Sequence, residues 1–159
     1  MLKMFNKKEC ILYSPINGEV IEIETVADKV FSSKMMGEGV GFILNEEFIC
    51  APCDGEISVI PSTLHAFGIT AKNGAEILVH VGLDTVNLQG EGFKKLVNQG
   101  DLVKKGTPVL KVDLELMKRK KIDLTTPMVI TNSSDFNIII NDLNKSITKE
   151  FRIMSCIKK

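Results

Sequence analysis

The sequence has no excess of charge and no long apolar run. Its 20 basic and 20 acidic residues cancel, so charge alone gives no reason to expect nucleic acid or an anionic membrane as a partner. Its longest uncharged runs fall short of the roughly 18 to 20 apolar residues that a membrane-spanning helix needs. Residues 1–8 lack an apolar signal core, so we expect a cytoplasmic protein.

The motifs of nucleotide and serine-triad chemistry are also absent. There is no Gly-x-Ser-x-Gly elbow, no Gly-x-x-x-x-Gly-Lys-Ser/Thr loop and no Gly-x-Gly-x-x-Gly fingerprint. The run Gly37-Glu-Gly39-Val-Gly41 is rich in glycine but lacks the flanking strand and helix of a dinucleotide site. The sequence therefore gives no support to nucleotide hydrolysis or Ser-triad catalysis.

An internal repeat organises what is present. The segment Leu12-Tyr-Ser-Pro-Ile-Asn-Gly-Glu-Val20 recurs 37 residues later as Ile49-Cys-Ala-Pro-Cys-Asp-Gly-Glu-Ile57. Each copy predicts strand, turn and strand, with Asn-Gly or Asp-Gly supplying a turn of positive φ. A related turn joins two β-rich runs within residues 100–112.

Short β-prone runs separated by Gly, Asn, Asp and Pro predict an all-β, antiparallel sandwich or barrel. Its 159 residues with 44% hydrophobic content suit one domain, residues 10–159, after a short flexible tail of residues 1–9. Helical turns are expected at residues 27–33, 92–97 and 114–122, and closing strands at 127–132 and 147–157.

The only two histidines, His65 and His80, lie in short apolar runs beside glycines. If residues 77–81 form a strand, His80 and Leu78 share one face and the apolar residues the other, so His80 points outward or into a cleft. A lone histidine is more often structural, but two that can converge, with Thr63 and Asp84 beside them, favour a functional site. A neutral imidazole could accept a phosphoryl group, because this transfer needs mainly alignment and charge neutralisation.

The cysteines allow a different interpretation. Cys50-Ala-Pro-Cys53 with the two histidines could supply four zinc ligands, and Cys-x-x-Cys can be a redox pair. However, the repeat places these cysteines in the slots of Tyr13 and Ile16, as ordinary residues around a turn proline. Cys10 and Cys156 suit a reduced compartment as small apolar residues.

Several segments between residue 14 and about residue 132 form a specific pattern: Ser14-Pro-Ile-Asn-Gly-Glu-Val20, residues 28–39, Ala51-Pro-Cys-Asp-Gly55, Thr63-Leu-His-Ala-Phe67, residues 74–86, Gly90-Glu-Gly-Phe93 and residues 126–132. In their order and spacing the sequence closely resembles the glucose-type IIA domain of the bacterial sugar phosphotransferase system. The resemblance implies an antiparallel β-sandwich with a duplicated hybrid motif.

The resemblance also implies residue roles. His80 is expected to carry the phosphoryl group, with His65 as the supporting histidine and Thr63 assisting the pair. The expected donor is phosphorylated HPr and the expected acceptor a cysteine of a membrane permease's IIB domain, with no cofactor and no nucleic acid. The implied partner-binding surface comprises Asp28 and Asp84, facing a partner's arginine, and the apolar residues Val30, Phe31, Met35, Met36, Leu78 and Val86.

Several alternatives stay open at this point. Zinc could bind incidentally between His65 and His80, completed by water or a partner. The unphosphorylated form could regulate other proteins, since phosphorylation would add charge to an apolar docking face. Related folds include metallopeptidases, which need more metal ligands than two histidines, and swinging-arm carriers, which need a lysine at the tip of a hairpin. Neither feature is recognisable in the sequence. Three positions depart from the family pattern and bear on partner preference: Lys29, Pro61 and Thr70.

Overall fold

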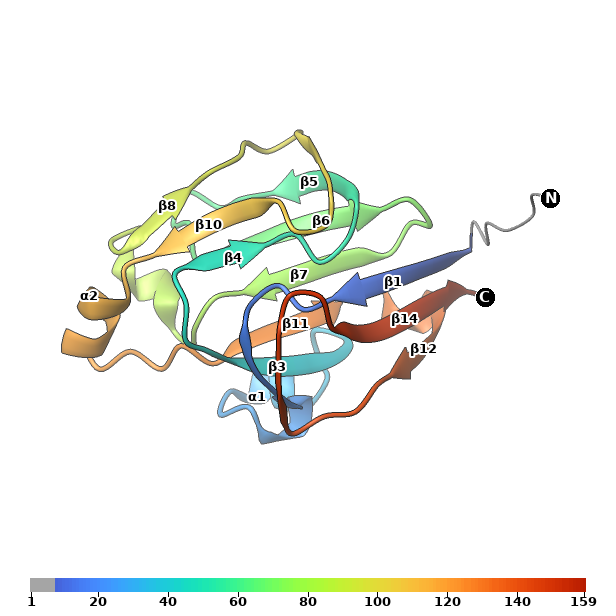
Figure 1. Ribbon diagram of the computed structural model, residues 1–159, viewed down its shortest axis with the longest axis horizontal. Coiled ribbons are helices and arrows are strands. Elements are labelled where there is room, and N and C mark those ends of the chain that lie inside the picture. Colours follow the sequence, from blue (N-terminus) through green and yellow to red (C-terminus); the bar gives the residue numbers. More distant parts are fainter. Residues whose placement is uncertain (1–7) are drawn as a thin grey trace.

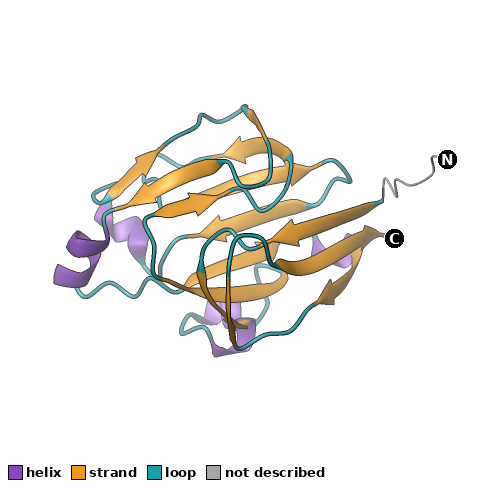
Figure 2. Ribbon diagram, in the orientation of Figure 1, coloured by secondary structure: helices purple, strands orange, loops and turns teal. Residues whose placement is uncertain are grey.

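The computed structural model describes residues 8–159, with strands as the dominant regular structure (Figures 1 and 2). The strands are β1 (Glu9–Tyr13), β2 (Gly18–Glu22), β3 (Glu38–Leu44), β4 (Phe48–Cys50), β5 (Gly55–Val59), β6 (Ala66–Ala71), β7 (Glu76–His80), β8 (Phe93–Lys95), β9 (Leu102–Val103), β10 (Pro108–Val112), β11 (Thr126–Ile130), β12 (Phe136–Ile140), β13 (Lys145–Ile147) and β14 (Arg152–Lys158). The short helices are η2 (Ile23–Thr25), α1 (Lys29–Ser32), η3 (Thr85–Leu88), α2 (Leu114–Arg119) and η4 (Ser133–Asp135). Residues 1–7 of the predicted tail lie outside the described residues, and Glu9 already belongs to β1.

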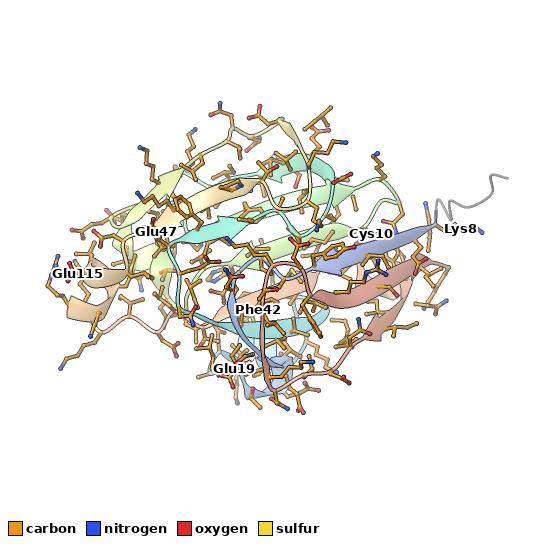
Figure 3. All side chains as sticks on the ribbon, in the orientation of Figure 1. Lys8, Cys10, Glu19, Phe42, Glu47 and Glu115 are labelled. Carbon is orange, nitrogen blue, oxygen red and sulfur yellow. The ribbon has the colours of Figure 1, made fainter. Side chains whose placement is uncertain are left out.

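The strands form three antiparallel sheets. The eight-stranded sheet has the order β13-β2-β3-β11-β7-β6-β5-β9, and two three-stranded sheets have the orders β1-β14-β12 and β4-β10-β8. One buried cluster joins all three sheets, through side chains such as Phe42 of β3, Leu110 of β10 and Met154 of β14. Phe42 lies inside this packing while charged side chains surround it at the periphery (Figure 3). The prediction of an all-β antiparallel sandwich is confirmed.

The repeat corresponds to a structural duplication. Backbone hydrogen bonds link the two copies reciprocally: Tyr13 donates to Pro52 (2.8 Å) and Cys50 donates to Pro15 (2.8 Å). The pairing repeats as well, because β2 lies between β3 and β13 as β5 lies between β6 and β9. The duplicated motif is therefore present, with the second copy inserted into the first.

The predicted positive-φ hairpin turns of the repeat are wrong. Gly18 and Gly55 have no positive φ, and the two strands of each copy enter different sheets. A side chain at these glycines would collide with a neighbouring backbone oxygen, that of Ile43 or of Thr70. Glycine is needed here because two backbone segments approach closely at a corner between sheets. The prediction went wrong because Asn-Gly and Asp-Gly are also typical of hairpin turns.

The helix predictions are partly correct. Helices α1 and α2 lie inside the expected ranges 27–33 and 114–122, and Asp113 caps α2 by accepting a hydrogen bond from the Leu116 amide at 3.1 Å. The range 92–97 instead contains strand β8, which pairs with β10. A strand was expected at 127–132 and β11 occupies 126–130, but the expected strand 147–157 is interrupted by a turn in which the Phe151 amide donates to the Thr148 oxygen.

Candidate active site

His80 ends strand β7 on the outer face of the large sheet. Side chains along β7 alternate between half-buried and fully buried, so His80 and Leu78 share the outer face as the alternation predicts. The His80 Nδ1 atom lies 2.7 Å from the backbone oxygen of Gly82. Because a carbonyl oxygen can only accept, Nδ1 carries the proton, and in the neutral ring the lone pair is on Nε2.

The backbone at Gly82 makes this hydrogen bond possible. Its φ is +81°, a left-handed conformation that favours glycine, and it turns the chain sharply after β7. A side chain here would lie 2.6 Å from Cγ2 of Thr85. Thr85 is fully buried and donates to the Val81 oxygen at 2.7 Å, which holds the turn rigid.

His65 stands beside His80 because β6 and β7 are adjacent strands. Ala66 is the register partner of His80, and the Val81 amide donates to the His65 oxygen at 2.7 Å. The two imidazole centroids lie 4.9 Å apart and the rings are nearly perpendicular, at 79°. The hydroxyl of Thr63 is 2.7 Å from His65 Nδ1. The structure thus brings together the three residues that the sequence singled out.

Both histidines are shifted toward their neutral form. Burial lowers the pKa of His80 below its ordinary value, although the hydrogen bond to Gly82 and the charges of Asp28 and Asp84 oppose this effect. Burial, and then the charge of His80, lower the pKa of His65. Each imidazole is therefore neutral at neutral pH, which leaves a lone pair on His80 Nε2.

Phe31 forms a support for the His80 ring. It is only 4% exposed, and its ring centroid lies 5.1 Å from that of His80 at an interplanar angle of 56°. It belongs to a small apolar cluster between helix α1 and the outer face of the sheet, which also contains Ile23, Val26, Leu83 and Val129. The expectation that Phe31 lies in an exposed docking surface does not fit this burial.

The other expected docking residues differ in their exposure. Val30, Met35 and Val86 are 44%, 78% and 47% exposed, whereas Met36 and Leu78 are half-buried and pack against the small cluster. Asp84 is exposed, with a φ of +57°. The carboxylate of Asp28 caps α1 by accepting a hydrogen bond from the Val30 amide at 3.0 Å.

The structure does not assemble the alternative metal site. Within residues 8–159, no three or more His, Cys, Asp or Glu side chains are grouped to hold a metal ion, so the two cysteines of Cys-x-x-Cys and the two histidines do not form a four-ligand set. Burial raises the pKa of the Cys50 thiol, with an opposing effect of Lys149, and a protonated thiol is a poor redox nucleophile. Nor does any helix in the described part of the chain have the length and apolar character to cross a membrane.

Sequence reasoning missed three features of the site. The Gly82 carbonyl could not be recognised in the sequence, since every residue has a backbone carbonyl. The support from Phe31 depends on a helix far from His80 in the sequence. The cap at Asp28 did have a signal, an aspartate just before a short apolar helical turn.

Comparison with known proteins adds independent findings. A family model for the phosphoenolpyruvate-dependent sugar phosphotransferase system, EIIA 1, matches residues 10–136. Glucose permease IIA from Mycoplasma capricolum is 32% identical, with a TM-score of 0.87 over 97% of this chain and 99% of that one. Two crystal structures of Helicobacter pylori Csd3 align over 90% and 89% of this chain and 33% and 37% of theirs. Their identity is 12% in each case and their TM-scores are 0.41 and 0.48, too low to bear on this chain.

Proposed function

Because the chain belongs to the EIIA 1 family of the phosphoenolpyruvate-dependent sugar phosphotransferase system, we propose that it is a phosphocarrier that acts through His80. It accepts a phosphoryl group from a phosphohistidine of HPr and passes it to a cysteine of a IIB domain during sugar uptake. The carrying observation is the 2.7 Å hydrogen bond from His80 Nδ1 to the Gly82 oxygen, which leaves Nε2 as the nucleophile.

The proposed first step exchanges one phosphorus–nitrogen bond for another. The Nε2 lone pair of His80 forms a bond to phosphorus while the bond to the donor histidine breaks, and its electron pair returns to the donor imidazole. In the second step a cysteine thiolate of the IIB domain attacks the same phosphorus, and His80 regains its lone pair. Both steps need alignment more than added chemistry, so the proposal requires no nucleotide or metal.

His65 has the position of a phosphoryl ligand in this proposal. Its ring is edge-on to His80 with centroids 4.9 Å apart, close enough for its free nitrogen to donate to a phosphoryl oxygen on His80. Thr63 Oγ1 holds the other nitrogen at 2.7 Å and so limits rotation of the ring. The exposed Val30, Met35 and Val86 would seal the site against water when a partner docks.

Labelling from phosphorylated HPr tests the proposal. Wild-type protein should take up one phosphoryl group, acid-labile as phosphohistidine is, and His80→Ala should take up none. His65→Gln should still become labelled but pass the label to a IIB domain slowly. Normal labelling of His80→Ala would exclude His80 as the acceptor, and circular dichroism would show whether each variant is folded.

The exposed apolar rim supports a second, compatible role. Met35 is 78% exposed beside the site, and a flexible methionine can adapt to more than one partner. A phosphoryl group on His80 would add charge in the middle of this rim, so regulatory binding should be confined to the unphosphorylated form. Calorimetric titration of any candidate target with both forms tests this, and equal affinities would exclude phosphorylation-dependent binding. Both roles correspond to action in the cytoplasm.

A further inference from the structure

A run of four cations covers the C-terminal end of helix α2 and the two residues after it, at one edge of the site. Lys118, Arg119, Lys120 and Lys121 are all exposed, and Lys120 pairs with Glu91 at 2.9 Å. Within residues 8–159, no ion pair joins an acidic residue to any of the other three. We call Lys118, Arg119 and Lys121 the basic edge.

The basic edge is attached directly to the loop that follows His80. The Leu83 amide donates to the Asp123 oxygen at 2.9 Å, which joins the segment after α2 to the active-site turn. Asp84 and Lys121 line one surface cleft of about 380 Å³. In Figure 1 the arrowhead of β7 points toward α2, and the C-terminus lies at the opposite end of the molecule.

Helix stability explains only part of this charge. Cations in the last turn interact favourably with the helix C-terminus, which accounts for Lys118 and Arg119. Lys121 lies beyond the helix with a φ of +58°, and its amide and that of Ile122 close the end by donating to Lys118 and Met117. Glycine is usual at such a position because other residues pay about 1–2 kcal/mol there. A lysine at this position is thus not explained by the backbone.

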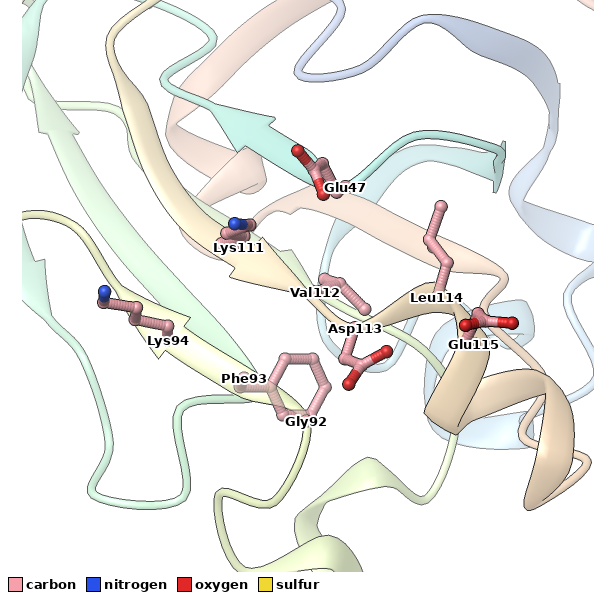
Figure 4. Close-up of a pocket in the computed structure, with 9 residues that line it drawn as sticks. All are labelled: Glu47, Gly92, Phe93, Lys94, Lys111, Val112, Asp113, Leu114 and Glu115. Carbon is pink, nitrogen blue, oxygen red and sulfur yellow. The ribbon is translucent and has the colours of Figure 1, made fainter.

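The other end of α2 does not carry the same charge. A depression of about 490 Å³ lies there, lined by Asp113 and Glu115 near the start of the helix and by Lys94 and Lys111 from neighbouring strands (Figure 4). Positive and negative side chains both line this depression, so it favours neither an anionic nor a cationic ligand. The three cations without an acidic partner within residues 8–159 are confined to the end of α2 that adjoins the site, where Asp84 and Asp123 line the same cleft as Lys121.

We propose that the basic edge selects the phosphorylated form of the donor, HPr, by attracting its phosphoryl charge; this rests on the function proposed above. A phosphoryl group adds about two negative charges, which the donor loses on transfer. The edge therefore favours arrival of the charged donor and release of the spent one. The basic edge would not help a IIB acceptor in this way, because the acceptor arrives without a phosphoryl group and must leave with one. A membrane surface fits less well, because no large apolar side chain between residues 113 and 123 is exposed for insertion.

Charge reversal tests the proposal through transfer kinetics. The variant Lys118→Glu/Arg119→Glu/Lys121→Glu is compared with Lys72→Glu/Lys158→Glu/Lys159→Glu, which makes the same change in net charge at exposed positions. Rapid-quench labelling from phosphorylated HPr at roughly 50 and 300 mM salt spans the range in which screening acts. The first variant should lower the second-order rate at least about tenfold at low salt and much less at high salt. The rate at saturating phosphorylated HPr should be unchanged, and the second-order rate of the control variant should fall less than about twofold.

The possible results separate this inference from the proposed function. Equal loss in both variants, or loss in neither, would overturn selection by the basic edge while labelling of His80 in wild type still supports the phosphocarrier. A slowing confined to the IIB step would assign the edge to the acceptor instead. Wild-type binding to vesicles containing phosphatidylglycerol that is lost on reversal, with unchanged donor kinetics, would assign it to a membrane. If wild type is not labelled at all, both proposals fail.

Discussion

Replacing Gly82 by alanine tests whether this turn holds His80, the proposed phosphoryl acceptor, in place. A left-handed φ of +81° costs an alanine about 1–2 kcal/mol. The new Cβ would also meet Thr85 Cγ2 at 2.6 Å and the Asp123 oxygen at 3.1 Å, and Thr85 is fully buried. Overpacking of this kind costs about 1–3 kcal/mol. The sum of about 2–5 kcal/mol corresponds to a fall in Tm of roughly 5–15 °C for a chain of this size.

Gly74→Ala is the matched control. Its φ is +92°, and nothing lies within 4 Å of an added Cβ, so it pays only the backbone cost of about 1–2 kcal/mol. Thermal unfolding followed by circular dichroism gives both Tm values. In Gly82→Ala the shifted carbonyl should also weaken its hydrogen bond to His80, worth about 0.5–1.5 kcal/mol, and slow phosphoryl uptake about 2- to 13-fold. Nitrogen-15 NMR of the imidazole should show Nδ1 protonated in wild type and a tautomer mixture in the variant. Equal Tm losses in the two alanine variants, with an unchanged tautomer, would refute this role of Gly82.

Three further predictions concern pH, Thr63 and Asn73. Since burial lowers the pKa of both histidines, phosphoryl uptake should be highest at neutral pH and fall to half of this level only below pH 6.5, the ordinary histidine value. Folding stability should weaken as the pH falls through the same range, because the unfolded chain takes up protons first; a midpoint of the decline in uptake above pH 6.5 would contradict the lowered pKa values. Thr63→Val should leave labelling of His80 nearly normal but slow transfer to a IIB domain about 2- to 13-fold, as expected for one hydrogen bond to His65, and Thr63→Ser should restore it. Asn73→Ala should lower the free energy of unfolding by about 2–4 kcal/mol in urea titrations, because the buried amide donates to the Lys8 and Cys156 oxygens; its initial transfer rate at 25 °C should match that of wild type.

The parts of the fold that follow from local pattern could be predicted. Strict alternation in residues 77–81 correctly placed His80 and Leu78 on one face, because side chains of a strand point to opposite sides. The repeat correctly indicated duplication. Its Asn-Gly and Asp-Gly pairs led to the wrong turns, because which sheet the next strand joins depends on partners far along the chain. Strand β8 was missed for the same reason: Phe93, Lys94 and Lys95 are extended because they pair with β10.

The site could be predicted as a set of side chains but not as a geometry. The two histidines and Thr63 are close in sequence, and adjacent strands bring them together. The carbonyl that selects the His80 tautomer belongs to a backbone whose direction only the folded turn determines. Phe31 was expected at the surface because the family resemblance placed it among the partner-binding residues, yet a short helix turns it inward onto His80. Side-chain type thus indicates which groups react, whereas protonation and support depend on tertiary packing.

The duplication places His80, the proposed phosphoryl acceptor, in one copy and an apolar counterpart in the other. Val20 pairs with Phe42 in the first copy as Ile57 pairs with Ile69 in the second, which makes Gly39 the counterpart of Ala66. Gly39 pairs with Val129 and Ala66 pairs with His80, so Val129 occupies the position of His80 in the first copy. Val129 is fully buried in the small cluster that holds Phe31 against His80. The counterpart of His80 is therefore part of the apolar base on which His80 rests, and a polar residue at Val129 should disturb the packing of Phe31 against His80.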